Sequence, residues 1–155
     1  MTTDLGTGMT ILTPDACWPL LRNAEVGRLA VVIGDHPEIF PVNHIVDHGT
    51  LVFRSAEGTK LAGAVPDRPV AFEVDGYEAA SGEAWSVIVK GQATEIEQMH
   101  ELFEAADLPL FPWHATPKQH FVRIVPDEVS GRRFGVVDPC QWGARATAVR
   151  PAAAE

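Results

Sequence analysis

A short polar stretch directly after an extended run carries the most legible chemistry in this sequence. Residues 50–54 read as extended, and Ser55-Ala56-Glu57-Gly58-Thr59-Lys60 follow at once. Glycine lets the backbone approach a ligand closely, hydroxyls donate hydrogen bonds, and arginine and lysine form charge-assisted bonds to phosphate. The stretch therefore predicts a phosphate-binding loop built from Arg54, Ser55, Gly58, Thr59 and Lys60. The alternative is a solvated loop, because the stretch matches neither a Walker loop nor GxGxxG.

The overall charge makes such a local site necessary for any anionic ligand. The 155 residues contain 12 Lys and Arg against 21 Asp and Glu, which gives a formal net charge of −9. A chain this acidic has no general attraction for nucleic acid or for an anionic membrane surface. We therefore expect no nucleic-acid partner and no membrane partner.

Cysteine and histidine usage argues against a metal site. Cys17 and Cys140 are the two cysteines of the chain, too few for a disulfide framework or a CxxC motif. His100, His114 and His120 match no standard zinc spacing, so no metal is predicted. The opening residues lack both a basic start and an apolar run, and no apolar segment is long enough to span a bilayer. The expected location is the cytoplasm.

Hydrophobic periodicity predicts a mostly β domain with peripheral helices. A helix capped by Thr13 or Asp15 is expected to end before Gly27. The predicted strands are 28–33, 39–46, 50–54, 69–74, 85–96, 120–125 and 128–134, with short helices at 61–64 and 98–106 and loops at 77–84 and 107–118. Pro41 indicates an edge position or bulge in the second strand, and Gly91 a bulge in the fifth.

Strand–turn–strand connections dominate this pattern, and strict βαβ alternation is missing. A small antiparallel β-barrel fits better than a doubly wound sheet. We expect one domain over residues 14–137, between a flexible N-terminal arm (1–13) and a flexible C-terminal tail (138–155).

A series of segments in this order resembles one known family. The segments are GRLAVV, PVNHIV, LVFRSAEGTKL, VAFEVDG, WSVIVKGQA and FVRIVPDEVSGRRF, which together cover residues 27–134. They resemble the pyridoxamine 5′-phosphate oxidase-like family, and more narrowly its FMN-binding split-barrel proteins of actinobacterial type. The resemblance implies a split β-barrel homodimer with two FMN sites at the subunit interface.

The resemblance also implies which residues hold the flavin. By this resemblance the loop from Arg54 to Lys60 binds the phosphate, and the isoalloxazine ring lies beside Pro41, Val42 and Asn43. Trp85 and Ser86 lie near the flavin, with part of the site supplied by the partner subunit. His44 stands where relatives often have tyrosine, and the residues that read pyridoxal phosphate in the true oxidase are not recognisable.

Several of these residues have simpler readings. Asn43 can bind the polar edge of a flavin or satisfy a strand edge, and His44, next to it, should face the other side of the sheet. Trp85 and Trp113 can be core residues or flat walls of a flavin site. Arg132 and Arg133 should point to opposite faces, one toward the partner's cofactor and one toward solvent.

Three functions follow from the resemblance. The first is an FMN-dependent oxidoreductase that passes electrons from a reduced nicotinamide to a small flat acceptor, a quinone or a nitro compound. The second is a non-enzymatic flavin or haem carrier or sensor, since relatives bind FMN, a deazaflavin or haem. The third is a deazaflavin-dependent reductase, whose longer acidic cofactor would require additional cations. No dedicated catalytic residue is recognisable.

Overall fold

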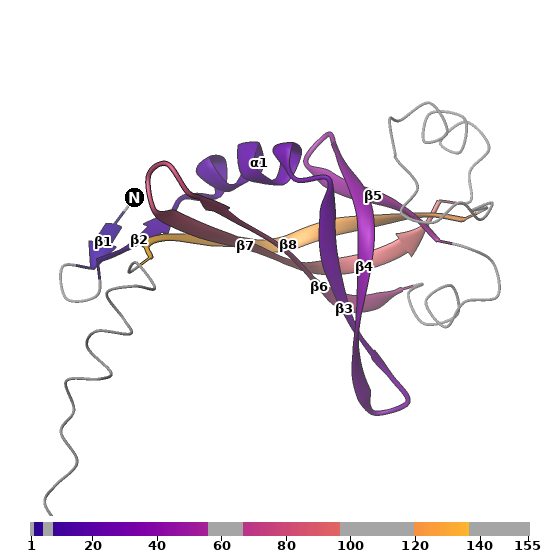
Figure 1. The fold of residues 1–155 in the computed structure, drawn as a ribbon. Coiled ribbons are helices and arrows are strands. Elements are labelled where there is room, and N and C mark those ends of the chain that lie inside the picture. The colour runs from indigo at the N-terminus through magenta and orange to yellow at the C-terminus, as the bar shows by residue number, and fades with distance from the viewer. Residues whose placement is uncertain (1, 5–7, 56–66, 97–119, 137–155) are drawn as a thin grey trace, which may run out of the picture.

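The computed structural model describes residues 2–4, 8–55, 67–96 and 120–136, and these residues form eight strands and one helix (Figure 1). The elements are β1 (Thr2–Asp4), β2 (Met9–Leu12), α1 (Pro14–Asn23), β3 (Val26–Ile33), β4 (His36–Asp47), β5 (Thr50–Ser55), β6 (Arg68–Glu78), β7 (Glu83–Glu95) and β8 (His120–Gly135). Every pairing between them is antiparallel. The predicted fold class is therefore confirmed.

Six of the strands close into a barrel. The sheet order is β1-β2-β8-β5-β4-β3-β6-β7, and an additional pairing of β7 with β8 completes the ring. Strand β8 pairs with β5 over its first residues and with β2 over its last ones. The pairing of β5 with β8 ends at Leu51 and Ile124. Beyond Ile124, β8 has no β5 neighbour, so the barrel wall is open on that side. Helix α1 packs against β8 and β4 near this opening.

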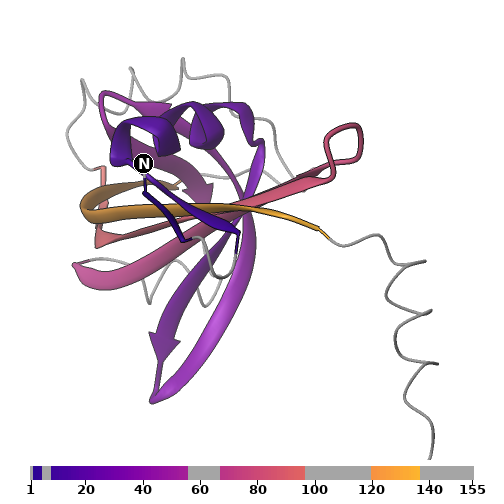
Figure 2. The ribbon, with the colours of Figure 1, turned by 90° about the vertical axis from the view of Figure 1, so that its left-hand side faces the viewer.

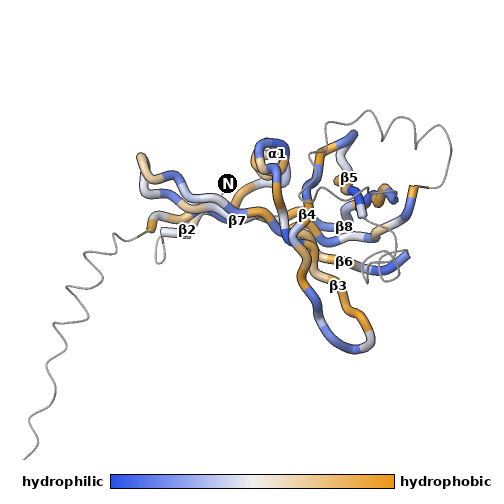
Figure 3. The backbone as a smooth tube through the Cα atoms, turned by 45° about the vertical axis from the view of Figure 1, so that its right-hand side comes forward, coloured by the Kyte–Doolittle hydropathy of each residue, from blue (hydrophilic) through white to orange (hydrophobic). Residues whose placement is uncertain are grey.

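The core follows directly from the alternation of the strands. The core on the inner face is formed by aliphatic and aromatic side chains, of which Phe53, Phe72, Leu29, Val87 and Val89 are fully buried. Cys17 and Leu21 of α1 join the same core. Figure 3 shows the hydrophilic residues gathered at the tip of the β3–β4 hairpin, where the chain leaves the core. A second, smaller apolar cluster of Val52 and Ile96 lies apart from this main core.

Two hairpin turns explain how the neighbouring strands stay in register. At the β4–β5 turn His48 and Gly49 both have positive φ angles, 47° and 73°. At the β3–β4 turn Gly34 and Asp35 also have positive φ angles, 53° and 66°. Two consecutive left-handed residues are the signature of the type I′ turn, whose twist matches that of paired strands. The predicted strands 39–46 and 50–54 are thus joined by a turn at residues 47–49.

A bulge in the β7–β8 pair keeps both ends of these long strands in one core. Lys90 pairs with Glu128 and Gly91 with Pro126, so Asp127 has no opposite residue. The extra residue switches the alternation of β8, so that Ile124 and Val129 both reach the core. A Cβ on Gly91 would lie 2.1 Å from the carbonyl oxygen of Val125. The bulge predicted at Gly91 is therefore confirmed.

The helix begins as the sequence predicts. Thr13 is its N-cap, and the Thr13 Oγ1 accepts a hydrogen bond from the backbone N–H of Ala16 at 3.3 Å. Pro14 follows in the first turn, where its missing N–H costs nothing. Pro41 lies in β4 outside the pairing with β5, which runs from His44 to Asp47, so β4 is locally an edge there. That prediction is also confirmed.

The structure differs from the sequence-based expectation in three places. Within the predicted loose arm, β1 and β2 are strands, and β2 is tied to β8 by backbone pairing from Thr10 to Leu12. Half of the predicted loop at 77–84 is strand, because β6 and β7 pair as far as Glu78 and Glu83. Strand β8 is continuous through Pro126, since the bulge accommodates the proline. The elements predicted at 61–64, 98–106, 107–118 and 138–155 lie outside the described residues.

Figure 2 shows the β3–β4 and β6–β7 hairpins projecting from the barrel in different directions. Among the described residues, no helix has the length and apolar character needed to cross a membrane.

Candidate functional site

Two of the predicted cofactor residues, Asn43 of β4 and Arg54 of β5, face the outside of the barrel just beyond the last β4–β5 pair. His44 of β4 pairs with Phe53 of β5, and both point into the core. Asn43 and Arg54 are the next residues on the two strands, so they share the opposite, outer face. Phe121 of β8 is the cross-strand partner of Arg54 and lies half-buried on its other side. The structure thus pairs a guanidinium with an aromatic ring across β5 and β8, and places an amide on the outer side of the neighbouring strand β4.

The Asn43 side chain is buried and only half satisfied. Its Nδ2 donates a hydrogen bond to the backbone carbonyl of Glu25 at 3.3 Å. Since that carbonyl can only accept, the amide orientation is fixed and Oδ1 points away from it. Oδ1 is buried and has no hydrogen-bond partner within the described part of the chain, while the residue as a whole is 9% exposed. A buried acceptor without a donor costs about 1–3 kcal/mol, so a ligand N–H would be well matched to this position.

His44 faces the other way, as alternation along the strand predicts. Its Nε2 donates a hydrogen bond to the carbonyl of Leu21 in α1 at 2.8 Å. Its ring packs edge-to-face against Phe72, with the two ring centroids 4.8 Å apart. The other ring nitrogen, Nδ1, is buried without a partner in the described structure. Burial lowers the pKa of His44, and the Leu21 carbonyl opposes this effect more weakly. His44 therefore fastens α1 to the barrel and does not face Asn43.

Ser55 ends β5 at one end of the barrel and lies inside it. It is 3% exposed and pairs across the sheet with His120, the first residue of β8. The Nδ1 of His120 is hydrogen-bonded to the carboxylate of Glu95, the last residue of β7. Gly58, Thr59 and Lys60, which complete the predicted phosphate loop, lie outside the described residues. Of that loop, the structure describes Arg54 on the outer face and Ser55 on the inner one.

A separate polar cluster stabilises the opposite end of β5. Arg123 donates hydrogen bonds to Asp47 Oδ2 at 2.9 Å and to Thr50 Oγ1 at 2.6 Å. The hydrogen bond from Arg123 lowers the pKa of Asp47, although partial burial of the carboxylate opposes it. His48 also contacts Asp47, at 2.8 Å, with its own side chain 95% exposed. These residues fix the β4–β5 turn and lie away from Asn43 along the strands.

The remaining predicted flavin residues occupy other surroundings. Pro41 is exposed on β4, whereas Val42 is buried in the core. Trp85 is half-buried against the core, and its indole covers Gly76, where a Cβ would lie 2.5 Å from the ring. Ser86, the next residue on β7, faces outward and lines a small pocket of about 100 Å³.

This small pocket combines two hydroxyls, a guanidinium and aliphatic walls. Its lining is formed by β2, β7 and β8 and consists of Ile11, Ser86, Ile88, Ser130, Gly131 and Arg132. Arg132 pairs across the sheet with Ser86, whereas Arg133 pairs with Trp85. By alternation the two arginines point to opposite faces, as predicted, and Arg132 belongs to the pocket face.

One chain keeps the two groups of predicted residues far apart. Phe121, beside Arg54, and Arg132, beside Ser86, are separated by eleven residues of β8, which crosses most of the molecule in Figure 1. At about 3.3 Å per residue this amounts to roughly 35 Å. Neither Arg54 nor Phe121 lines the small pocket at Ser86 and Arg132, so the two groups belong to different places on one chain.

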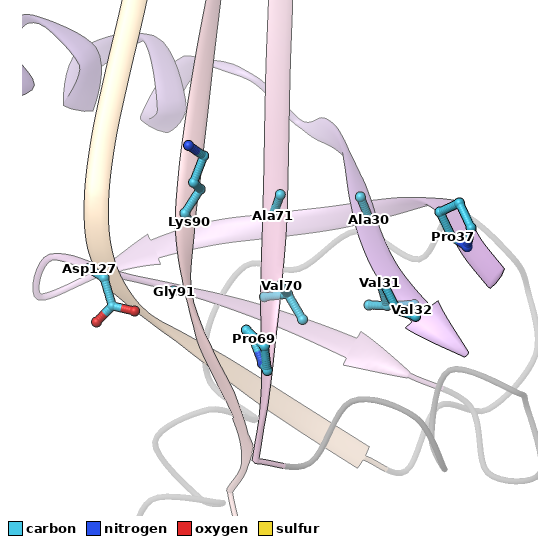
Figure 4. Close-up of a pocket in the computed structure, with 10 residues that line it drawn as sticks. All are labelled: Ala30, Val31, Val32, Pro37, Pro69, Val70, Ala71, Lys90, Gly91 and Asp127. Atoms are coloured by element: carbon cyan, nitrogen blue, oxygen red, sulfur yellow. The ribbon is translucent and has the colours of Figure 1, made fainter. Parts of the chain in front are cut away.

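A larger pocket of about 360 Å³ opens where β3 and β6 diverge (Figure 4). The two strands pair only from Arg28 to Ala30 of β3, and Val31 and Val32 then separate from Pro69 and Val70. The lining is aliphatic except for Lys90 and Asp127 at the bulge. None of the predicted cofactor residues lines it, and a single ammonium beside a carboxylate is poorly suited to a phosphate. We therefore do not assign the flavin to this pocket.

Sequence reasoning missed Phe121, Glu95 and the backbone carbonyl of Glu25, and it considered His120 only as a possible metal ligand. The position of Phe121 beside Arg54 follows only from the register of β5 with β8, which local sequence patterns do not specify. The His120–Glu95 contact joins residues 25 positions apart, at the ends of two strands. Among the described residues, no three His, Cys, Asp or Glu side chains lie close enough to hold a metal ion.

Comparison with known proteins gives one consistent match. The family model for pyridoxamine 5′-phosphate oxidase matches residues 13–133. The solved structure of an FAD-binding protein from Mycobacterium smegmatis is 38% identical, with a TM-score of 0.72 over 81% of this chain and 98% of that one. A candidate pyridoxamine 5′-phosphate oxidase from Corynebacterium glutamicum is 39% identical, with a TM-score of 0.75 over 84% and 96% of the two chains. The uncharacterised protein Rv3129 of Mycobacterium tuberculosis is 46% identical over 58% of this chain and 80% of its own.

Proposed function

This chain belongs to the pyridoxamine 5′-phosphate oxidase-like family, and we propose that it binds a flavin nucleotide and uses it for electron transfer. The observation that carries the proposal is the Oδ1 of Asn43 on β4, which is buried and has no hydrogen-bond partner among the described residues. The polar edge of an isoalloxazine ring presents an N–H that such an acceptor binds, and the phosphate complements a guanidinium. The residues present therefore fit the group.

Each residue has a distinct part in this proposal. Asn43 Oδ1 accepts from the ring, held in orientation by its bond to the Glu25 carbonyl. Phe121 offers an apolar wall beside Arg54, which neutralises the phosphate together with the predicted loop residues Gly58, Thr59 and Lys60. The flavin, when bound, supplies the redox chemistry, and the protein supplies binding and orientation. No side chain of the described site is assigned a proton-transfer step.

We further propose that the site is completed by a second copy of the chain. The small pocket at Ser86 and Arg132 has the hydroxyls and the guanidinium expected of a flavin contact, yet it lies roughly 35 Å from Arg54 along β8. In a two-fold symmetric dimer each chain can contribute one group to each of two identical sites. Dimer formation thus explains why both groups are present on one chain.

The cofactor is FMN in the simplest form of the proposal. The Mycobacterium smegmatis relative is described as FAD-binding, and FAD presents the same ring with a longer phosphate chain. A deazaflavin is the third candidate, and haem the fourth. Extraction of the purified protein followed by chromatography of the released chromophore separates all four.

The binding test uses two ligands and two variants. Asn43→Leu removes the acceptor for the ring, so it should weaken FMN and riboflavin alike, by about tenfold for one lost hydrogen bond. Arg54→Gln removes a phosphate contact, so it should weaken FMN and leave riboflavin unchanged. Asn23→Leu, an exposed asparagine at the end of α1, is the control. Unchanged affinity of Asn43→Leu for both ligands would contradict the assignment.

The catalytic part of the proposal is an oxidoreductase that takes electrons from a reduced nicotinamide and passes them to a quinone or nitro compound. Turnover of NADH or NADPH with each acceptor is compared with that of free flavin at the same concentration. Turnover well above free flavin supports the enzyme. Tight binding with turnover no faster than free flavin would instead assign the chain to the carriers or sensors.

A further inference from the structure

The outer face of β3 is apolar where a free sheet face is ordinarily polar. An antiparallel strand with one face in the core alternates apolar and polar residues, whereas a strand buried on both faces is a continuous apolar run. From Leu29 to Ile33, β3 is such a run. Leu29 and Val31 are buried in the core, while Val32 on the outer face is 55% exposed. The sequence of β3 is therefore typical of a strand that is covered on both faces.

The register of five strands places one row of side chains across this outer face. Ile39 of β4 pairs with Ala30 of β3, and Ala30 pairs with Ala71 of β6. Ala71 pairs with Lys90 of β7, and Lys90 pairs with Glu128 of β8. Cross-strand partners point to the same face, and Figure 4 shows Ala30, Ala71 and Lys90 directed to one side. These five residues form the outer row.

The outer row has a ridge beside a trough. Ile39 is 69% exposed and stands on the β3–β4 hairpin, which projects from the barrel in Figure 2. Ala30 and Ala71, with the smallest side chains after glycine, form the trough next to it and also line the aliphatic pocket of about 360 Å³. In a two-fold contact the same patch of each copy meets the other, so a patch with both a ridge and a trough can match itself.

Charge also favours a second copy of the chain over a basic partner. The chain has a formal net charge of −9, so two copies repel each other unless their contact surface is close to neutral. The charges of the outer row are Lys90 and Glu128, which form an ion pair of 3.7 Å at one end of it. A basic partner would meet no unpaired carboxylate in this row.

The outer row is also continuous with the two groups that the proposed function assigns to the flavin. Ser86 and Ile88 precede Lys90 at alternate positions of β7, so they share its face, and both line the small pocket. Asn43 shares the face of Ile39 on β4 in the same way. Each group is four residues from the row, which is about 13 Å along a strand. A second copy seated on the outer row therefore lies within reach of both.

We propose that two copies of the chain associate through the outer row. Ile39 and Val32 of each copy seat in the Ala30–Ala71 trough and the aliphatic pocket of the other. The inference rests on the second copy invoked in the proposed function and names the surface that this copy covers. It requires no bound flavin, so it can be tested on the protein alone.

Sedimentation equilibrium of the full chain without flavin measures the Kd of the dimer. Val32→Lys and Ile39→Lys should each raise it by about 100-fold, because an ammonium is buried without a partner in both halves of a two-fold contact. Each substitution makes the net charge less negative, so general repulsion between copies cannot explain a weaker dimer. Val136→Lys is the matched control, at an exposed valine whose N–H bonds the Gly82 carbonyl beside the β6–β7 turn. It should leave the Kd unchanged or slightly lower.

A mixing experiment tests the contact between ridge and trough. Ala71→Glu places a carboxylate in the trough, so it should also weaken association of the variant with itself. A mixture of Ile39→Lys and Ala71→Glu chains should associate more tightly than either variant alone, because one copy then offers the cation and the other the anion. Thermal unfolding of each variant establishes that it is folded.

The failures of the two proposals are distinguishable. A wild type that stays monomeric at the highest concentration measured would overturn the inference. A dimer that neither Val32→Lys nor Ile39→Lys weakens, or a mixture no tighter than its components, would also overturn it, while flavin binding by that protein would leave the proposed function intact. A wild type that dimerises through this row but binds none of FMN, FAD and riboflavin would overturn the proposed function and leave the interface.

Discussion

Replacing His44 by glutamine should remove a pH-dependent part of the stability of this protein. The His44 ring is 6% exposed, its Nδ1 is buried without a partner in the described structure, and burial lowers its pKa from the ordinary value of 6.5. Glutamine can still donate to the Leu21 carbonyl but does not titrate. The substitution therefore separates the titration of His44 from its hydrogen bond.

The sign and size of the effect follow from linkage. Since the pKa of His44 is lower in the folded state, the unfolded chain binds the proton first as the pH falls through 6.5. Stability from this residue is thus complete above pH 6.5 and is lost progressively toward the lowered folded pKa. The loss is at most about 1.4 kcal/mol per pH unit. Between pH 7.5 and 5.5 this amounts to about 1.4 kcal/mol, if the folded ring stays neutral in that interval.

Urea denaturation at several pH values measures this directly. The wild type should lose more free energy of unfolding between pH 7.5 and 5.5 than His44→Gln does, by at most about 1.4 kcal/mol. Comparing slopes removes the constant cost of burying glutamine. His48→Gln, at a side chain that is 95% exposed, should keep the slope of the wild type. Equal slopes for the wild type and His44→Gln would refute the reasoning.

Two further predictions concern stability. Gly91→Ala should destabilise the protein by about 1–3 kcal/mol, because the new Cβ would meet the Val125 carbonyl oxygen at 2.1 Å. Gly135→Ala, which meets nothing within 4 Å, should change little, and equal urea midpoints for the two variants would contradict this account. Arg123→Leu should destabilise the β4–β5 turn by about 1 kcal/mol at neutral pH, and by less in acid. Arg123 lowers the pKa of Asp47, so that contribution disappears once the carboxylate is protonated; a loss that is the same at pH 3 and pH 7 would count against the ion pair.

Much of the fold could be predicted because it depends on local pattern. The alternation of apolar residues marks the strands, and Asp47, His48 and Gly49 form a turn that needs two left-handed residues. Gly91 signals the bulge because no side chain fits against the backbone of β8 there. The β2 strand was missed because a four-residue segment next to glycines carries almost no periodic signal, and pairing with β8 decides its conformation.

The candidate site divides along the same line. The sequence by itself determined the residue types that suit a flavin phosphate, Arg54 and Ser55 among them, and it determined by alternation that Asn43 and His44 face opposite sides. Only the tertiary structure decided that Phe121 flanks Arg54, that Asn43 Oδ1 is buried without a partner in the described structure, and that Glu95 holds His120. It also decided that Ser86 of β7 pairs with Arg132 of β8, at a part of β8 far from Phe121. The physical reason is that cross-strand register joins residues far apart in sequence, and local residue patterns do not specify which strands become neighbours.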